Sequence, residues 1–379
     1  MSQPPPLPAA PDGRPEVKAQ QKHECPACGA EAQWNPAKQA LVCPYCGAVS
    51  SALLHEDTGQ VVERDQAIAL RDIPDEKRGW QSEKTSVKCQ SCQAITVFDP
   101  TRAAQRCDFC GSSALIPLDQ IQAPIRPDSL LEFKISDVKV REMVREWYGA
   151  RWFAPTALKG RALTDTLRGL YIPYWTFDAQ VHADWCAESG YHYYETESYR
   201  DSDGETKTRQ VQNTRWVPSS GALDHFFDDE LVPASRGIPE GLLRKIEPFP
   251  TTSDLKPYDP GYLSGWIVEQ YQIDLIAAAA NSQKTMGAKT EALCASAVPG
   301  DTHRSLSVDT DFSGQTFKHI LVPVWVIAYT FGSRSFQVVV NGYTGTIAGK
   351  HPLSWIKITL SVIAAIAVIL LLLYLFSDK

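Results

Sequence analysis

Eight cysteines arranged in two identical patterns constrain this chain more than any other feature. Each pattern joins two Cys-x-x-Cys pairs through fourteen residues. The tight turn of such a pair directs both thiolates at one ion, and two pairs joined by a short hairpin complete a tetrahedral shell. The spacing therefore predicts two metal sites with four thiolate ligands each, formed by Cys25, Cys28, Cys43 and Cys46 and by Cys89, Cys92, Cys107 and Cys110.

The two patterns belong to a duplicated zinc-ribbon module. An offset of 64 residues aligns all eight cysteines without a gap. The same offset aligns Trp34-Asn35-Pro36 with Phe98-Asp99-Pro100, in each case an aromatic residue followed by a turn. Gly47 and Gly111 follow the last cysteine of each set, where the turn often requires a positive φ. A pattern shared outside the cysteines indicates a repeat rather than two chance clusters.

The expected cofactor is zinc, with two structural ions per chain. A closed shell of four thiolates leaves no coordination position for water or substrate, so neither site is expected to be catalytic. Iron in a rubredoxin-like shell is the alternative, because both metals accept four thiolates in a tetrahedron. A redox-active Cys-x-x-Cys would need a strand and a helix around it, which the predicted hairpins do not provide.

The C-terminal segment is predicted to cross a membrane once. Residues 358–376 contain no charged side chain, and nineteen helical residues span close to the ~30 Å hydrocarbon core. Trp355 and Tyr374 lie near the two ends, where aromatic rings favour the interface. Lys350 and Lys357 precede the segment, and thiolates need a reducing compartment. With no N-terminal secretion signal, we expect a single-pass inner-membrane protein whose N-terminal bulk faces the cytoplasm.

The sequence predicts an α+β fold class: two small β ribbons, a β-rich α+β domain and one C-terminal transmembrane helix. The expected segments are a disordered Pro-rich tail at 1–21, ribbon 1 at 22–50, a linker at 51–86, ribbon 2 at 87–118, the α+β domain at 119–352 and the membrane anchor at 353–379.

Within the α+β domain, hydrophobic periodicity predicts three helices and a long hairpin. The helices are expected at 137–148, 238–247 and 274–297, and the hairpin strands at 189–197 and 207–216. Ile172-Pro173-Tyr174-Trp175 matches Val322-Pro323-Val324-Trp325 at an offset of 150. This match suggests two related β units that pack together.

The sequence contains no pattern typical of a catalytic site. A phosphate-binding Gly-x-x-x-x-Gly-Lys-Ser/Thr loop, a His-Glu-x-x-His motif and a Gly-x-Ser-x-Gly elbow are all missing. Asp224-His225 and Asp228-Asp229-Glu230 form an acidic cluster that could hold a cation, but the preferred prediction is a solvated loop. Cys186 and Cys294 are predicted to be small buried residues. Scattered histidines are expected to be structural, namely His182, His192, His225, His303 and His319. We therefore expect a protein that is not an enzyme.

Four segments of the chain resemble an uncharacterised bacterial family of membrane-anchored double zinc-ribbon proteins. They are residues 169–178, 226–229, 317–325 and 340–345. Members are sometimes labelled primosomal replication-restart helicase, a label that this sequence does not support because it lacks a nucleotide-binding motif. Gly349-Lys350-His351-Pro352 stands where the family has Gly-Glu-Arg-Pro. The resemblance implies the architecture above and no established activity.

Charge favours protein partners over nucleic acid. The formal net charge is -7, from 37 basic and 44 acidic residues, so no global positive field attracts phosphates. The predicted hairpin mixes aromatic residues with charges of both signs, which suits protein contact. We therefore expect a membrane-anchored adaptor or scaffold that binds proteins at the cytoplasmic face. The alternative is a membrane-associated nucleic-acid-binding factor related to DNA replication.

Overall fold

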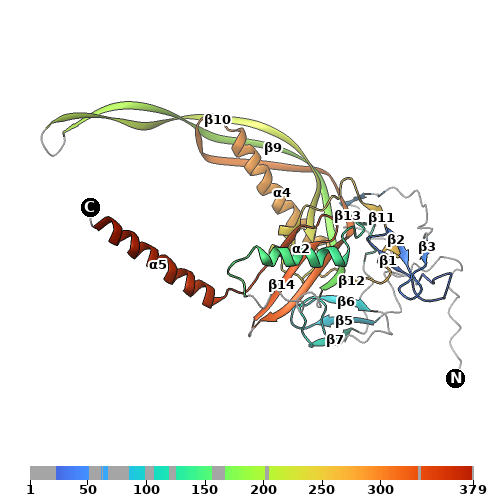
Figure 1. Ribbon diagram of the computed structural model, residues 1–379. Helices are drawn as coiled ribbons and strands as arrows, with labels where there is room; N and C mark the ends of the chain where they lie inside the picture. The colour runs from blue at the N-terminus through green and yellow to red at the C-terminus, as the bar shows by residue number, and fades with distance from the viewer. Residues whose placement is uncertain are drawn as a thin grey trace, which may run out of the picture.

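The computed structural model describes residues 23–50, 61, 63–66, 85–98, 106–118, 125–155, 167–200, 205–331 and 334–377. The predicted tail and most of the predicted linker lie outside these residues. The described residues form a mixed α+β fold with two cysteine clusters and one large mixed sheet (Figure 1). The expected α+β class is therefore confirmed at this level.

Three long antiparallel strands form a ribbon that extends well beyond the body of the protein (Figure 1). They are β9 (Leu167–Arg200), β10 (Thr206–Pro233) and β13 (Thr302–Phe331), in the order β10-β9-β13. The first residue of β13, Thr302, pairs with Gly190. Residues 191–200 and 206–215 therefore form a two-stranded projection, which we call the arm. The predicted hairpin is confirmed and is longer than expected.

Helix α4 (Leu275–Ala297) covers one face of the ribbon. Along β9, alternate residues from Ala179 to Ala187 are buried, and those between them are exposed. Ala278 and Met286 of the helix pack in one apolar cluster with Ala179 and Val181, and Cys294 packs in another with Ala183, Trp185 and Ala187. The Asp274 carboxylate accepts a hydrogen bond from the Ala277 N–H and caps the helix at the predicted position. The helix and the ribbon therefore share two apolar clusters.

The two matching tetrapeptides lie on adjacent strands at the centre of the sheet. Ile172 of β9 lies directly opposite Val322 of β13, and both side chains are fully buried. On its other edge, β9 pairs first with β12 (Ile267–Glu269) in parallel and then with β10. Shorter strands complete the sheet: β4 (Arg64–Asp65), β5 (Thr85–Cys89), β6 (Ile95–Phe98), β7 (Leu115–Leu118), β8 (Ser129–Leu130), β11 (Lys256–Pro257), β14 (Arg334–Asn341) and β15 (Ile347–Gly349).

Short helices close the core at the base of the ribbon. Helix α2 (Asp137–Gly149) starts at the predicted cap Ser136 and buries Val140, Val144 and Tyr148. Helix α3 (Glu240–Ile246) buries Leu242, Leu243 and Ile246, within the range predicted for it. A 3-10 turn, η4 (Pro260–Leu263), adds the buried Tyr262 and Leu263.

A helix is present where the membrane span was predicted. Helix α5 (Trp355–Ser377) leaves the body after Ser354, whose backbone N–H donates to the Phe153 carbonyl at 2.7 Å. Over the residues that the structure describes, no helix combines the length and the apolar character needed to cross a membrane. The predicted transmembrane helix at 353–379 is therefore not shown.

Candidate metal centres

The first cysteine quartet lies in turns that adjoin a separate small sheet. Strands β1 (Gln33–Asn35), β2 (Ala40–Val42) and β3 (Val49–Ser50) form this sheet in that order. In each knuckle a glycine N–H closes the turn, from Gly29 to the Cys25 carbonyl at 2.8 Å and from Gly47 to the Cys43 carbonyl at 3.0 Å. Both glycines have φ of 72°, a conformation that favours glycine.

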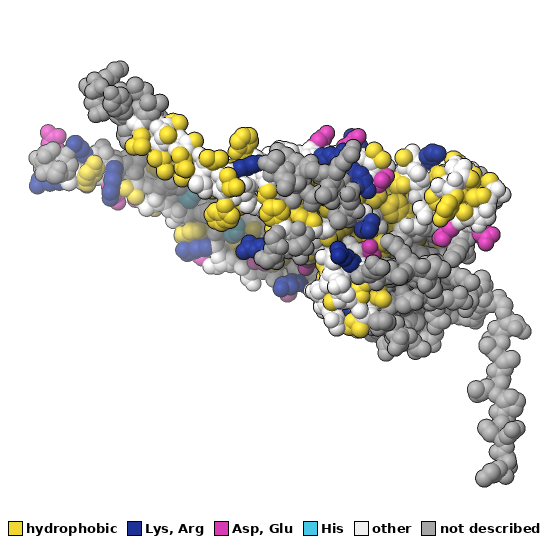
Figure 2. Space-filling model, turned by 60° about the horizontal axis from the view of Figure 1, so that its bottom comes forward, with side chains coloured by type: hydrophobic (Ala, Val, Ile, Leu, Met, Phe, Trp, Pro, Cys, Tyr) yellow, Lys and Arg dark blue, Asp and Glu magenta, His cyan; other side chains and the backbone are white. Residues whose placement is uncertain are grey.

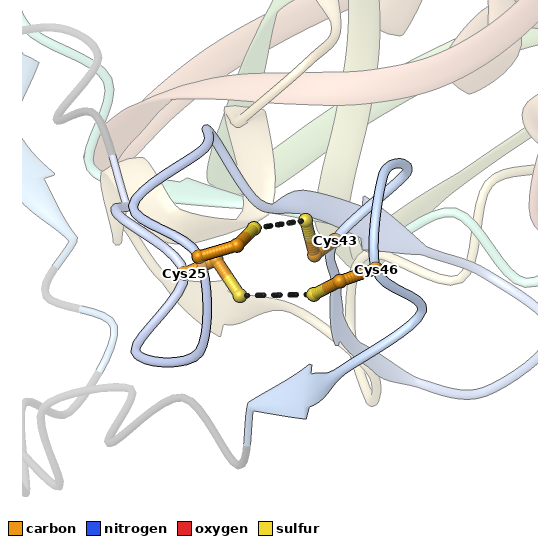
Figure 3. Close-up of side chains that lie close together, drawn as sticks. Cys25, Cys43 and Cys46 are labelled. Carbon is orange, nitrogen blue, oxygen red and sulfur yellow. Dashed lines mark hydrogen bonds between the residues drawn. The ribbon is translucent and has the colours of Figure 1, made fainter.

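The four sulfur atoms of ribbon 1 converge on one point between the two knuckles (Figure 3). The Sγ atoms of Cys25 and Cys46 are 3.5 Å apart, as are those of Cys28 and Cys43. All four lie within 4.8 Å of one another. A disulfide would bring two sulfurs to about 2.0 Å, and all ten cysteines of the chain are free thiols.

The second quartet repeats this geometry within the large sheet. The Sγ atoms of Cys89 and Cys110 are 3.6 Å apart, and those of Cys92 and Cys107 are also 3.6 Å apart. Gly111 has φ of 74°, matching Gly47, as the sequence predicted. Strand β6 of this ribbon pairs with β12, which pairs with β9. Ribbon 2 is therefore continuous with the main sheet, whereas ribbon 1 is not.

Both quartets fit a four-coordinate metal ion. Metal–sulfur bonds of about 2.3 Å in a tetrahedron place the sulfurs about 3.8 Å apart, close to the spacing in both clusters. Backbone N–H groups of Cys46 and Tyr45 lower the pKa of the Cys43 thiol to about 6. At Cys46 the Ala48 N–H acts in the same direction, but hydrogen bonds with the Cys25 and Cys28 thiols outweigh it and raise the pKa to about 12. The structure thus brings together all eight cysteines predicted as ligands, in the predicted sets.

The two ribbons contact the body through different faces. Ribbon 1 uses its hairpin, where the Trp34 and Tyr262 rings lie 4.7 Å apart and the backbone N–H of Trp34 donates to the Ser264 carbonyl at 3.2 Å. Ribbon 2 uses a knuckle, where the Phe109 carbonyl accepts a hydrogen bond from Gln337 Nε2 at 2.6 Å. The sequence repeat gave no sign of this difference.

The acidic run in β10 was predicted wrongly as a solvated loop. Asp229 and Glu230 are both only 7% exposed, and they lie at an irregularity in the pairing of β10 with β9. The Lys318 ammonium of β13 lies 2.8 Å from Asp229 Oδ1, and Lys289 of α4 lies 2.5 Å from Glu230. These lysines provide counter-charges and tie β10 to its neighbours.

Sequence reasoning missed the Asp178 partner of this cluster. One oxygen from each of Asp178, Asp228 and Asp229 lies within 4.8 Å of the others. Asp178 Oδ1 accepts from the Asp229 N–H at 2.6 Å, and Asp178 Oδ2 accepts from the Thr316 hydroxyl at 2.8 Å. Burial raises the pKa of Asp178. Pairing between β9 and β10 creates this contact, which spans fifty-one residues of sequence.

A second missed group is Glu269, a fully buried carboxyl on β12. Its Oε1 accepts from Gln272 Nε2 at 2.9 Å, and burial raises its pKa to about 7. His319 is likewise buried, with Nδ1 2.9 Å from the Ile125 carbonyl oxygen, as expected for a structural histidine. The prediction for Cys294 is confirmed, but Cys186 is exposed.

Comparison with known proteins finds one distant likeness along most of the chain. The sequence is 25% identical over 346 residues to "Uncharacterized protein YdjG" of Bacillus subtilis (strain 168). The alignment covers 88% of this chain and 90% of that protein. No protein-family model matches the sequence, and no solved structure matches it. The likeness therefore extends over most of both chains, and the name of that protein specifies no activity.

Proposed function

We propose that this protein is a zinc-ribbon adaptor that holds other proteins at the cytoplasmic face of the inner membrane. The observation that carries the proposal is the arm, a polar and aromatic two-stranded projection of the central ribbon (Figure 1). A two-stranded hairpin is marginally stable alone in water, so a long one is well suited to being covered by a partner.

Zinc is the proposed ion at both cysteine quartets. Four converging thiols and tetrahedral spacing suit zinc or iron, and a closed shell gives the ion a structural role. In ribbon 1 the ion would be held by Cys25, Cys28, Cys43 and Cys46, and in ribbon 2 by Cys89, Cys92, Cys107 and Cys110. It supplies folding free energy to modules too small to form a core of their own.

Membrane attachment through α5 is supported by the apolar surface of that helix. Hydrophobic side chains lie along its described part in the view of Figure 2. Ile356, Leu360, Val362, Ile363, Ile366, Val368, Ile369 and Leu370 are all exposed. A helix that is apolar on every side needs an apolar environment. The free thiols agree with a cytoplasmic, reducing location.

Charge pairing along the ribbon supports a protein partner over nucleic acid. Arg209 lies 3.0 Å from Glu197 and 5.7 Å from the Tyr199 ring centroid. Arg304 lies 2.7 Å from Glu188 and 4.2 Å from the Trp216 ring centroid. These guanidinium groups already have carboxylate partners, so phosphate binding would have to compete with them.

The test is recovery of partners from membranes by the full chain and by a variant whose arm is replaced by a tight turn after Gly190. We expect the variant to remain in the membrane fraction and to keep its metal, but to lose crosslinked protein partners. An unchanged partner set would contradict the role of the arm. Salt-sensitive binding of single-stranded DNA by the purified full chain would favour the alternative function instead.

A further inference from the structure

Because the two ribbons are duplicated, the surroundings of equivalent residues in ribbon 1 and ribbon 2 can be compared directly. In ribbon 2 the knuckle residue Phe109 is fully buried among Cys89, Ala94 and strands of the main sheet. Its ring fits against Gly237, where an added Cβ would lie 2.7 Å from Phe109 Cδ1. The aromatic ring of this knuckle therefore fills an apolar pocket of the main domain.

The equivalent knuckle of ribbon 1 has no such pocket in the described structure. Tyr45 occupies the position of Phe109 at the 64-residue offset, and its side chain is 82% exposed. Pro26 and Ala27 of the first knuckle are also exposed, as is Pro44, which precedes Tyr45, and Val49 is 54% exposed. We call these five residues the knuckle face. Figure 2 shows hydrophobic side chains gathered at the end of the molecule that carries ribbon 1.

Among the described residues, none covers the knuckle face, because ribbon 1 is attached to the body at its opposite end. Trp34 and Leu41 of the hairpin are buried in the body. Gln39, in the hairpin turn, donates from Nε2 to the Phe133 carbonyl at 3.0 Å. These contacts hold the ribbon firmly and direct its knuckles away from the core.

Charge at the knuckle end is negative. Residues 23–50 contain two acidic residues, Glu24 and Glu31, and one cation from lysine or arginine, Lys38. The two glutamates pair across the base of the first knuckle and are exposed. Lys38 lies in the hairpin turn beside Gln39, at the attached end. A partner surface must therefore offer positive charge around an apolar centre.

We propose that the knuckle face of ribbon 1 docks Tyr45 into an apolar pocket of a partner protein, and that this pocket has a rim of lysine or arginine. The inference rests on the proposed adaptor function and names a second surface, besides the arm, that contacts a partner. The ring enters as Phe109 does in ribbon 2, and the phenol oxygen remains near the rim, where it finds a polar partner. A nucleic acid does not fit, because its phosphates would face Glu24 and Glu31.

Photo-crosslinking from the full chain in cells tests this proposal. A benzophenone amino acid is placed at Ala27, in the knuckle face, in the native background and with Tyr45→Ala. The matched control places it at Val138, an exposed residue of α2 on the body. We expect a discrete protein adduct from position 27, little from position 138, and a roughly tenfold or greater loss with Tyr45→Ala, as for a central aromatic anchor.

The identity of the crosslinked peptide tests the predicted character of the partner's pocket. Support requires that it line an apolar pocket flanked by lysine or arginine, and that adduct yield fall as salt rises. A nuclease-sensitive adduct, a lipid adduct, a crosslink to a second copy of this chain, or an adduct unaffected by Tyr45→Ala overturns the proposal. Absence of any adduct at position 27 also overturns it.

A second probe separates failure of this proposal from failure of the adaptor function. Tyr194 is exposed on the arm, away from ribbon 1. Protein adducts from position 194 with none from position 27 would reject the knuckle face and retain the adaptor. No protein adduct from either position would reject both.

Discussion

Tyr45 and Phe109 occupy the same position in two successive ribbons, yet Tyr45 is 82% exposed and Phe109 is 0% exposed. Truncation should therefore have opposite consequences in the two modules. We expect Phe109→Ala to cost about 3–5 kcal/mol of unfolding free energy, because it leaves a cavity in the core. Tyr45→Ala should change it by about 0.5 kcal/mol or less, as for other surface positions.

Urea unfolding of the metal-loaded chain in detergent measures both variants, with metal content checked first. Similar losses for the two substitutions would contradict the different docking of the ribbons. Equal metal content in both variants would show that the difference arises from packing and not from loss of the ion.

The second prediction concerns metal removal. Because β6 pairs with β12 at the centre of the sheet, loss of metal from ribbon 2 should loosen the main domain. Ribbon 1 forms its own sheet, so its loss should remain local. We expect Cys107→Ser to expose backbone amides of β12 and β9 to hydrogen exchange, and Cys43→Ser to leave them protected. Native metal analysis should give two zinc ions, and each variant one.

The repeat made the metal sites predictable from sequence, since cysteine spacing alone determines which thiols can share an ion. Helix α2 was equally predictable, because the cap Ser136 and the helical spacing of Val140, Val144 and Tyr148 are signals from residues close in sequence. Helix α2 depends on contacts between residues close in sequence, and the metal sites depend on cysteine side chains that share one role, metal binding.

The remaining features depend on contacts between distant residues. Nothing local distinguishes Tyr45 from Phe109, because their burial is decided by where each ribbon packs. The polar run at Asp229 reads as a loop until Lys318, eighty-nine positions later, supplies its counter-charge. Likewise, the length of β9 follows from its pairing with β13 more than from its own sequence.

The third prediction concerns this buried pair of Asp229 and Lys318. Lys318→Met should cost about 3–5 kcal/mol, because it leaves the Asp229 carboxylate buried without its counter-charge. Replacing both residues by Lys318→Met with Asp229→Leu should recover much of that loss. Chemical denaturation of the single and double variants gives the coupling directly. Additive losses in the double variant would show that the two charges do not compensate each other.

The last prediction concerns pH and Glu269. Burial raises the pKa of its carboxyl to about 7, above the ordinary value of 4.5. Between about pH 4.5 and about pH 7, the Glu269 carboxyl therefore keeps its proton in the folded state and releases it in the unfolded state. Its stabilising contribution is complete below about pH 4.5 and is lost as pH rises through about 7. From about pH 5.5 to about pH 7.5, Glu269 should reduce the unfolding free energy by about 2 kcal/mol.

Glu269→Gln removes this dependence, because an amide keeps the same shape without ionising. We expect the variant to be less sensitive to rising pH and more stable than the native chain at about pH 8. His319, whose burial lowers its pKa to about 3, destabilises the fold as pH falls below about 6.5. Because His319 is present in both proteins, the difference between their urea-unfolding curves isolates Glu269. Parallel pH profiles would show that this carboxyl is already ionised in the folded core.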